Sequence, residues 1–269
     1  MSQLTPTFQR LRDQQTTALV TYVTAGDPDR ERSIEVVRAV ARGGADVMEL
    51  GVPFSDPLAD GPVIQRASER ALRAGATLDW VLDLVARERR NLPPVVLFTY
   101  ANPVLRMGPD RFTRRAAEAG VDGVLVLDVP LEEIASLRVS LDGVGLDTIL
   151  LLSPTTTDER MVRAGQLASG FLYAISRLGV TGARDKVSEG AAAIVARIRR
   201  HTALPIALGF GLSRPEHVAD VGRYADGAVV GSALVDVVAH HAASPALGLE
   251  VERFVRWLAQ GRQREPTEQ

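Results

Sequence analysis

Three carboxylates gather in one short segment, MELGVPFSDPLADGPVIQ, at residues 48–65. Glu49 interrupts an apolar run that is typical of a buried strand, and Asp56 and Asp60 follow in a loop that prolines stiffen. An ionised carboxylate is costly to bury, so a Glu in such a strand needs a partner or a proton. Two carboxyl groups in unlike surroundings can act as acid and base near neutral pH. The segment therefore suggests proton transfer.

Each carboxylate also has a simpler explanation. Glu49 could be half of a buried ion pair or accept hydrogen bonds from backbone groups. Asp56 and Asp60 stand next to Pro and Gly, where Asp commonly forms turns. Placement favours the chemical interpretation for Glu49 and Asp60, because a loop that leaves the end of a strand can bring its side chains over the same pocket.

The elements that must position these acids alternate along the chain. Eight short runs rich in Val, Leu and Ile are separated by stretches with helical periodicity, which is the pattern of βαβ units around a parallel sheet. The predicted strands cover residues 18–25, 46–52, 94–100, 123–129, 147–153, 170–176, 205–211 and 226–233.

Eight strand-and-helix units in 269 residues predict an α/β fold, a single (β/α)8 TIM barrel over residues 1–269. We expect an extra helix before the first strand, an extra helix after the second strand, and a flexible tail over residues 262–269. A doubly wound open sheet is the alternative, but TAGDPDRE after the first strand is not a glycine-rich dinucleotide turn.

Strand alternation assigns a face to each residue of the second strand. Met48 and Leu50 suit packing against helices, which leaves Val47, Glu49 and Gly51 facing the barrel interior. Functional residues of such barrels lie at the carboxyl ends of the strands. We therefore expect Glu49 and Asp60 to meet over one apolar pocket that raises the pKa of Glu49.

Glycine-rich segments end the last three strands and predict an anion site. They read RLGVTGARDKV, GFGLSRPEH and VVGSALVD, and Ser232 in the last one offers a hydroxyl. Glycines let backbone N–H groups approach an anion, and phosphate sites in barrels are often built by the loops after strands seven and eight. The first of these segments is long enough to form a mobile lid.

Composition excludes several other kinds of protein. The formal net charge of −2 provides no source for non-specific electrostatic binding of polyanions such as nucleic acid. The absence of Cys excludes disulfides and thiolate chemistry. The four histidines fall in or beside predicted helices, so we expect no metal site. No run has the length of a signal or membrane-spanning segment, so we expect a cytoplasmic protein.

The same segments resemble a known family. MELGVPFSDPLADGPVIQ is similar to the signature of the tryptophan synthase alpha subunit family, an indole-3-glycerol-phosphate lyase family. Its other motifs are matched, in order, by TYVTAGDP, YANPVLRMG, GVLVLDVPLEE, LLSPTTTDER, FLYAISRLGVTGAR, LGFGLS and DGAVVGSALV. The resemblance covers about residues 18–240. It implies a (β/α)8 barrel that cleaves indole-3-glycerol phosphate to indole and glyceraldehyde 3-phosphate by a retro-aldol step in tryptophan biosynthesis.

The resemblance also implies roles for individual residues. Glu49 matches the acid and base that serves the indole ring carbon, Asp60 matches the acid that handles the indole N–H proton, and Tyr173 matches a residue that supports the substrate. The remaining matches are Gly182, Gly211, Gly231 and Ser232 for phosphate, Tyr22, Phe98, Leu125, Phe210 and Val229 for the indole pocket, and Arg177 and Thr181 for the lid. Tyr22 and Phe98 replace a Phe and a Leu of some members, which leaves the shape of the pocket open.

The family works with a beta subunit that carries pyridoxal phosphate and receives indole through a tunnel. The resemblance implies an alpha2beta2 heterotetramer in which Asp56, Asn102 and Pro103 face the partner, and no cofactor in this chain. Three alternatives stay open: a lyase that works alone and releases indole, a barrel without activity that activates a partner, and another phosphosugar barrel such as an isomerase. The intact Glu49 and Asp60 argue against the last two.

Overall fold

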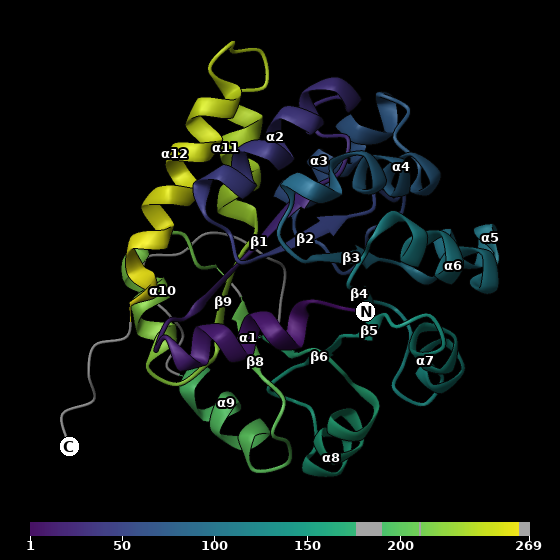
Figure 1. Ribbon diagram of the computed structural model, residues 1–269, viewed down its shortest axis with the longest axis vertical. Helices are drawn as coiled ribbons and strands as arrows, with labels where there is room; N and C mark the ends of the chain where they lie inside the picture. The colour runs from purple at the N-terminus through teal and green to yellow at the C-terminus, as the bar shows by residue number, and fades with distance from the viewer. Residues whose placement is uncertain (176–189, 210, 264–269) are drawn as a thin grey trace.

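The computed structural model describes residues 1–175, 190–209 and 211–263. In this part of the chain, nine parallel strands form one sheet in the order β5-β4-β3-β2-β1-β9-β8-β7-β6. Figure 1 shows the helices arranged around these strands. The predicted barrel is confirmed, and so are the extra helices at the N-terminus and after the second strand.

The strands begin within two residues of the predicted starts. Their bounds are β1 (Ala18–Thr24), β2 (Val47–Gly51), β3 (Val95–Thr99), β4 (Gly123–Val126), β5 (Asp147–Thr148), β6 (Leu150–Leu152), β7 (Leu172–Ile175), β8 (Ile206–Gly209) and β9 (Gly227–Val230).

The predicted fifth strand closes the barrel in two pieces. Its first half, β5, pairs with β4, and its second half, β6, pairs with β7. The change of neighbour occurs at Ile149, whose N–H still donates to the Val124 carbonyl at 2.9 Å. The β4–β5 ladder ends at Val124, so no ladder pair joins Leu125–Val126 to β6 in the described chain. We call this stretch between β4 and β6 the seam.

The helices lie between the strands as the sequence predicts. The structure adds a short helix, α5, and a last helix, α12, which the sequence analysis did not identify as separate elements. Asp29 caps α2 by accepting hydrogen bonds from the Glu31 and Arg32 N–H groups, and Gly44 ends that helix with φ of 96°. The helices are α1 (Leu4–Asp13), α2 (Arg30–Gly43), α3 (Pro62–Arg73), α4 (Leu78–Glu88), α5 (Ala101–Met107), α6 (Pro109–Ala119), α7 (Ile134–Asp142), α8 (Asp158–Leu167), α9 (Ala191–Arg199), α10 (Pro215–Gly222), α11 (Ser232–His240) and α12 (Leu247–Ala259), with 3-10 turns η1 (Arg89–Asn91) and η2 (Gln260–Arg262).

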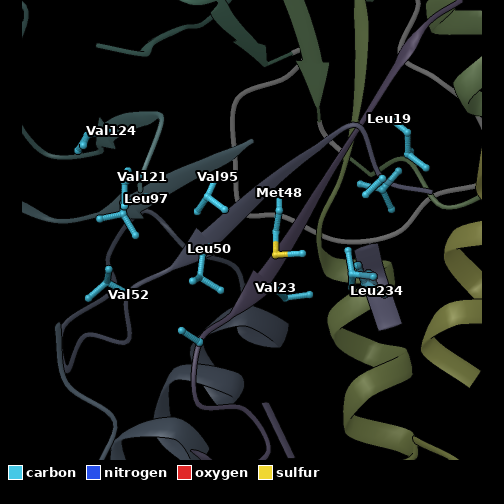
Figure 2. Close-up of a cluster of buried hydrophobic side chains, with 14 of the residues drawn as sticks. Leu19, Val23, Met48, Leu50, Val52, Val95, Leu97, Val121, Val124 and Leu234 are labelled. Carbon is cyan, nitrogen blue, oxygen red and sulfur yellow. The ribbon is translucent and has the colours of Figure 1, made fainter. Parts of the chain in front are cut away.

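Two apolar layers lie on the two faces of the sheet. Met48 and Leu50 belong to the layer between strands and helices, together with side chains such as Val81 of α4. Figure 2 shows both residues within this layer. Val47 lies instead in the barrel interior with Val20 and other strand residues. The predicted phase of β2 is therefore confirmed.

Helix α1 closes the end of the barrel where the strands begin. Leu4, Phe8 and Leu11 pack into the interior cluster, and the Phe8 ring lies 5.3 Å from that of Phe171. The Gln3 N–H donates to the Asp122 carboxylate at 2.8 Å, which fixes the start of the helix. Figure 1 shows α1 crossing over the strands. The opposite end, where the strands finish, stays available for a site.

The first residues of the predicted tail are bound to the barrel. The Arg262 guanidinium donates to Asp46 Oδ2 at 2.7 Å, its carbonyl accepts the Thr17 N–H, and Gln263 bridges to Thr16. The prediction of a flexible tail is therefore wrong for Arg262 and Gln263, because both residues have fixed partners. Residues 264–269 lie outside the described part of the chain.

Candidate active site

A cavity of about 190 Å³ opens at the carboxyl ends of the strands. Nearly every strand of the barrel contributes a side chain to it, which is typical of barrel active sites. Its lining residues are Tyr22, Glu49, Ala59, Asp60, Ile64, Phe98, Leu127, Leu151, Tyr173, Ile175, Gly211, Leu212, Val229, Gly231, Ser232 and Ala233.

Glu49 is fully buried in this cavity. Neither of its carboxyl oxygens has a hydrogen-bond partner among the described residues. The ion pair that could have explained this residue is absent from the described salt bridges, and burial alone raises the pKa of Glu49 from 4.5 to about 8. At neutral pH the group is mainly a protonated acid that can give up its proton.

Asp60 has a different environment. It lies in the loop between β2 and α3, is 5% exposed, and accepts a hydrogen bond from the Tyr100 hydroxyl at 2.9 Å. Burial raises the pKa of Asp60 to about 6, and the Tyr100 hydroxyl opposes that rise. Tyr100 also accepts the Ala59 N–H at 3.2 Å, so it holds the loop and the carboxyl group together. The two acids of the cavity thus differ in charge near pH 7.

Tyr22, which is buried, and Tyr173, which is half-buried, complete the floor around Glu49. A Cβ at Gly51 would lie 2.1 Å from the Tyr22 hydroxyl, and a Cβ at Gly209 would lie 2.4 Å from the Tyr173 hydroxyl. The strand ends therefore need glycine at these two positions to admit the rings. Burial raises the pKa of both tyrosines well above 10, and the nearby Glu49 carboxyl adds to the rise for Tyr173. Both tyrosines remain neutral hydroxyl groups.

The side of the cavity at β8 and β9 suits an anion. Gly231 precedes α11, and Ser232 and Ala233 of its first turn line the cavity. The first N–H groups of a helix have no partner within it and carry partial positive charge. The first turn of α11 contains no acid, and Gly211 adopts φ of 77° at the end of β8. These features would suit a phosphate, and the predicted phosphate site stays a prediction.

Other predicted residues fall elsewhere. Leu125 is buried in the barrel interior and does not contact the cavity. Asp56 is exposed in the loop after β2, Asn102 is exposed in the first turn of α5, and Pro103 is half-buried beside Asn102. Four further candidates, Arg177, Thr181, Gly182 and Phe210, lie outside the described residues.

The sequence analysis missed several lining residues. Leu127, Leu151 and Ile175 contact the cavity. The alternation that selected Glu49 would have selected them as well, since each lies two residues beyond an inward-facing position at Leu125, Ile149 or Tyr173. The bond from Tyr100 to Asp60 joins residues forty positions apart, and no local pattern announces it.

The described residues contain no cluster of three or more His, Asp or Glu side chains able to hold a metal ion. Among the described helices, none has the length and apolar character that a membrane span requires.

Comparisons with known proteins point to one family. The family model described as tryptophan synthase alpha chain matches residues 8–260. The alpha chain of Solibacter usitatus is 46% identical over 262 residues, 97% of this chain and 98% of that one. The alpha chain of Geobacter sulfurreducens is 48% identical over 256 residues, 95% and 97% of the two chains.

Solved structures agree with these relatives. A chain of tryptophan synthase from Mycobacterium tuberculosis superposes with a TM-score of 0.91 at 35% identity and covers 98% of this chain and 99% of its own. Tryptophan synthase subunit alpha from Legionella pneumophila gives a TM-score of 0.88 at 36% identity, with coverage of 97% and 98%.

The environment of Glu49 predicts an unusual pH dependence of stability. Between pH 4.5 and about 8 the folded chain keeps a proton that the unfolded chain loses, so the free energy of unfolding falls as pH rises. A glutamine side chain does not titrate, so Glu49→Gln should not show this loss. Between pH 4.5 and pH 8, the free energy of unfolding of the variant should gain up to roughly 4 kcal/mol on that of the native chain. Urea unfolding at several pH values measures the difference.

Glu88→Gln is the matched control. Glu88 is equally buried, but it accepts two hydrogen bonds from Arg38, at 2.6 and 2.8 Å, and these bonds lower its pKa. That change should destabilise the chain at pH 8. A Glu49→Gln variant that loses stability at pH 8 in the same way would show that Glu49 has a charged partner.

Proposed function

Since this chain belongs to the tryptophan synthase alpha chain family, we propose that its cavity cleaves indole-3-glycerol phosphate to indole and glyceraldehyde 3-phosphate. One observation carries the proposal: two carboxyl groups with pKa values of about 8 and about 6 line the same cavity as an anion-binding helix start. A retro-aldol cleavage that begins by protonating a ring carbon needs this combination.

The substrate has one natural orientation in such a cavity. Its phosphate binds at Gly211, Gly231 and Ser232, where backbone N–H groups and a hydroxyl can donate to it. In the barrel, β8 and β9 lie across from β3 and β4. The indole ring therefore extends toward Phe98, Leu127 and Leu151, whose side chains form the apolar side of the cavity.

Glu49 performs the steps at the ring carbon that bears the glycerol chain. The protonated carboxyl donates its proton to this carbon, and the resulting carboxylate accepts the proton of the adjacent glycerol hydroxyl. The carbon–carbon bond then breaks, the hydroxyl carbon becomes the aldehyde, and the bonding electrons return to the indole ring. The group ends with the proton count it began with, and its pKa of about 8 suits both directions of transfer.

Asp60 serves the ring nitrogen. Protonation of the ring carbon places positive charge on the nitrogen, and an ionised Asp60 takes or stabilises the N–H proton, which it returns as the bond breaks. The hydrogen bond from Tyr100 opposes the effect of burial and keeps Asp60 mainly ionised at neutral pH. Tyr173 of β7 lies across the cavity from Glu49 and supports the substrate through its neutral hydroxyl.

We also propose that a beta subunit covers the rim of the cavity, in an alpha2beta2 complex within the cytoplasm. Asp56 lies in the loop after β2, and Asn102 and Pro103 lie at the start of α5. Leu58 in the same loop is 91% exposed and Leu105 of α5 is 65% exposed, and we expect the partner to cover both. Pyridoxal phosphate belongs to the partner in this scheme.

The direct test is indole release from indole-3-glycerol phosphate by the purified chain. Asp60→Asn and Glu49→Gln should each keep the fold and lower kcat by roughly a hundredfold or more, because each removes a proton-transfer group. Circular dichroism and thermal melting confirm that the variants fold. Full activity in either variant would refute the role assigned to that residue, and no cleavage by the native chain, alone or with a beta subunit, would refute the function.

A change at Tyr100 should move one limb of the pH–rate profile. The native profile should fall below about pH 6 as Asp60 gains a proton, and above about pH 8 as Glu49 loses its proton. Tyr100→Phe removes the hydrogen bond that lowers the pKa of Asp60, so the acid limb of the profile should move to higher pH while the basic limb stays in place. Movement of both limbs would show that Tyr100 acts on more than Asp60.

The partner surface predicts a selective defect. Leu105→Lys should weaken beta-subunit binding at least tenfold and leave indole release by the isolated chain unchanged, because Leu105 lies outside the cavity. Leu249→Lys on α12 is the control, since Leu249 is 52% exposed on another element. Calorimetric titration with the beta subunit of the same organism measures both. Cleavage that is fast alone and unchanged by the partner would favour the lyase that works alone.

A further inference from the structure

A second cavity of about 170 Å³ lies beside the catalytic one. We call it the side cavity. Its walls come from the end of β4 and the loop after it, from β6, and from the start of α8. They are formed by Val126, Leu127, Val129, Pro130, Leu131, Leu150, Leu151, Leu152, Thr156 and Arg160.

The side cavity exists because of the seam. The ladder between β4 and β5 stops at Val124, and β6 pairs with β7 on its other edge. The side cavity is lined by Val126 on one edge of the seam and by Leu150 and Leu152 on the other. The sheet thus lacks a continuous wall at this point, and side chains alone separate the barrel interior from the space outside it.

Two of those side chains, Leu127 and Leu151, line both cavities. Their backbones are fixed, because the Leu127 N–H donates to the Thr99 carbonyl at 2.9 Å and Leu151 pairs with Tyr173 in the β6–β7 ladder. The partition between the cavities is therefore two leucine side chains on a rigid frame. We call this pair the leucine partition.

The chemistry of the side cavity selects a neutral apolar guest. Its lining is mostly Val, Leu and Pro, and the Arg160 guanidinium at its edge is paired with the Glu132 carboxylate. With that charge neutralised, an anion gains little there. Apolar cavities of about 150 Å³ hold benzene-sized molecules, so a methyl or larger apolar group fits.

We propose that the leucine partition determines which substituted indole rings the enzyme accepts, and that the side cavity binds apolar substituents on the six-membered ring. This inference rests on the proposed function, which orients the indole ring toward Leu127 and Leu151. Leu127 is half-buried and Leu151 is 37% exposed, and in the native chain their side chains stand between the two cavities, so they obstruct a substituent that points at them. Shortening either leucine opens the side cavity and admits that substituent.

The experiment compares kcat/KM for indole-3-glycerol phosphate with that for its four derivatives that carry one methyl group on the six-membered ring, which are isomers of one another. Leu127→Ala and Leu151→Ala should raise the ratio for one and the same isomer roughly tenfold or more, since one methylene in an apolar pocket commonly changes specificity by that amount. Adding Leu131→Phe to Leu127→Ala fills the side cavity and should remove the gain. Val162→Ala, on the exposed face of α8, is the control that should change no ratio.

A second arm does not depend on turnover. Titration calorimetry with indole and the four indoles methylated on the six-membered ring measures the same preference as a ratio of dissociation constants. Equal changes for all isomers in both leucine variants, or a gain that survives the filling by Leu131→Phe, would overturn the inference. Absence of cleavage by the native chain would refute the proposed function, and the binding ratios would still decide the role of the leucine partition.

Discussion

The alternation of side chains in a closed parallel barrel is the constraint on which the site depends. A strand covered by helices on one face must bury apolar residues there, and in β2 these are Met48 and Leu50. Glu49 stands between these two residues in the strand, so its side chain must point into the barrel interior. The closed barrel buries Glu49 fully and gives its carboxyl oxygens no partner among the described residues, so the raised pKa of Glu49 follows from the topology of the sheet.

The two ends of the barrel are specialised by what closes them. Helix α1 fills the end where the strands begin with Phe8 and its apolar neighbours, so the barrel interior is packed at that end. At the other end, loops rather than a helix meet the barrel, and they bring polar groups over an apolar floor. This arrangement explains the moderately raised pKa of Asp60. The loop buries the carboxyl group, which raises its pKa, and the hydrogen bond from Tyr100, just after β3, opposes that rise.

How much the sequence could predict depends on how local each cause is. The phase of β2 and the inward position of Glu49 follow from residues 47 to 51 alone, and the structure has them as predicted. The partner of Asp60 and the division of the fifth strand at Ile149 depend on which strands become neighbours in space. Leu125 was assigned to the indole pocket by resemblance alone, whereas its side chain packs deeper in the barrel interior and does not line the cavity.

The division at Ile149 connects geometry to chemistry. A barrel of short strands must change hydrogen-bond partners somewhere, and here the change falls beside β4, one of the two strands that lie across from β8 and β9. At that point the sheet offers no backbone wall, so packing by Leu127 and Leu151 replaces it. Backbone ladders resist substitution, whereas a side-chain wall changes with a single residue. The ring end of the cavity is therefore the part that can vary between relatives without disturbing Glu49, Asp60 or the anion end.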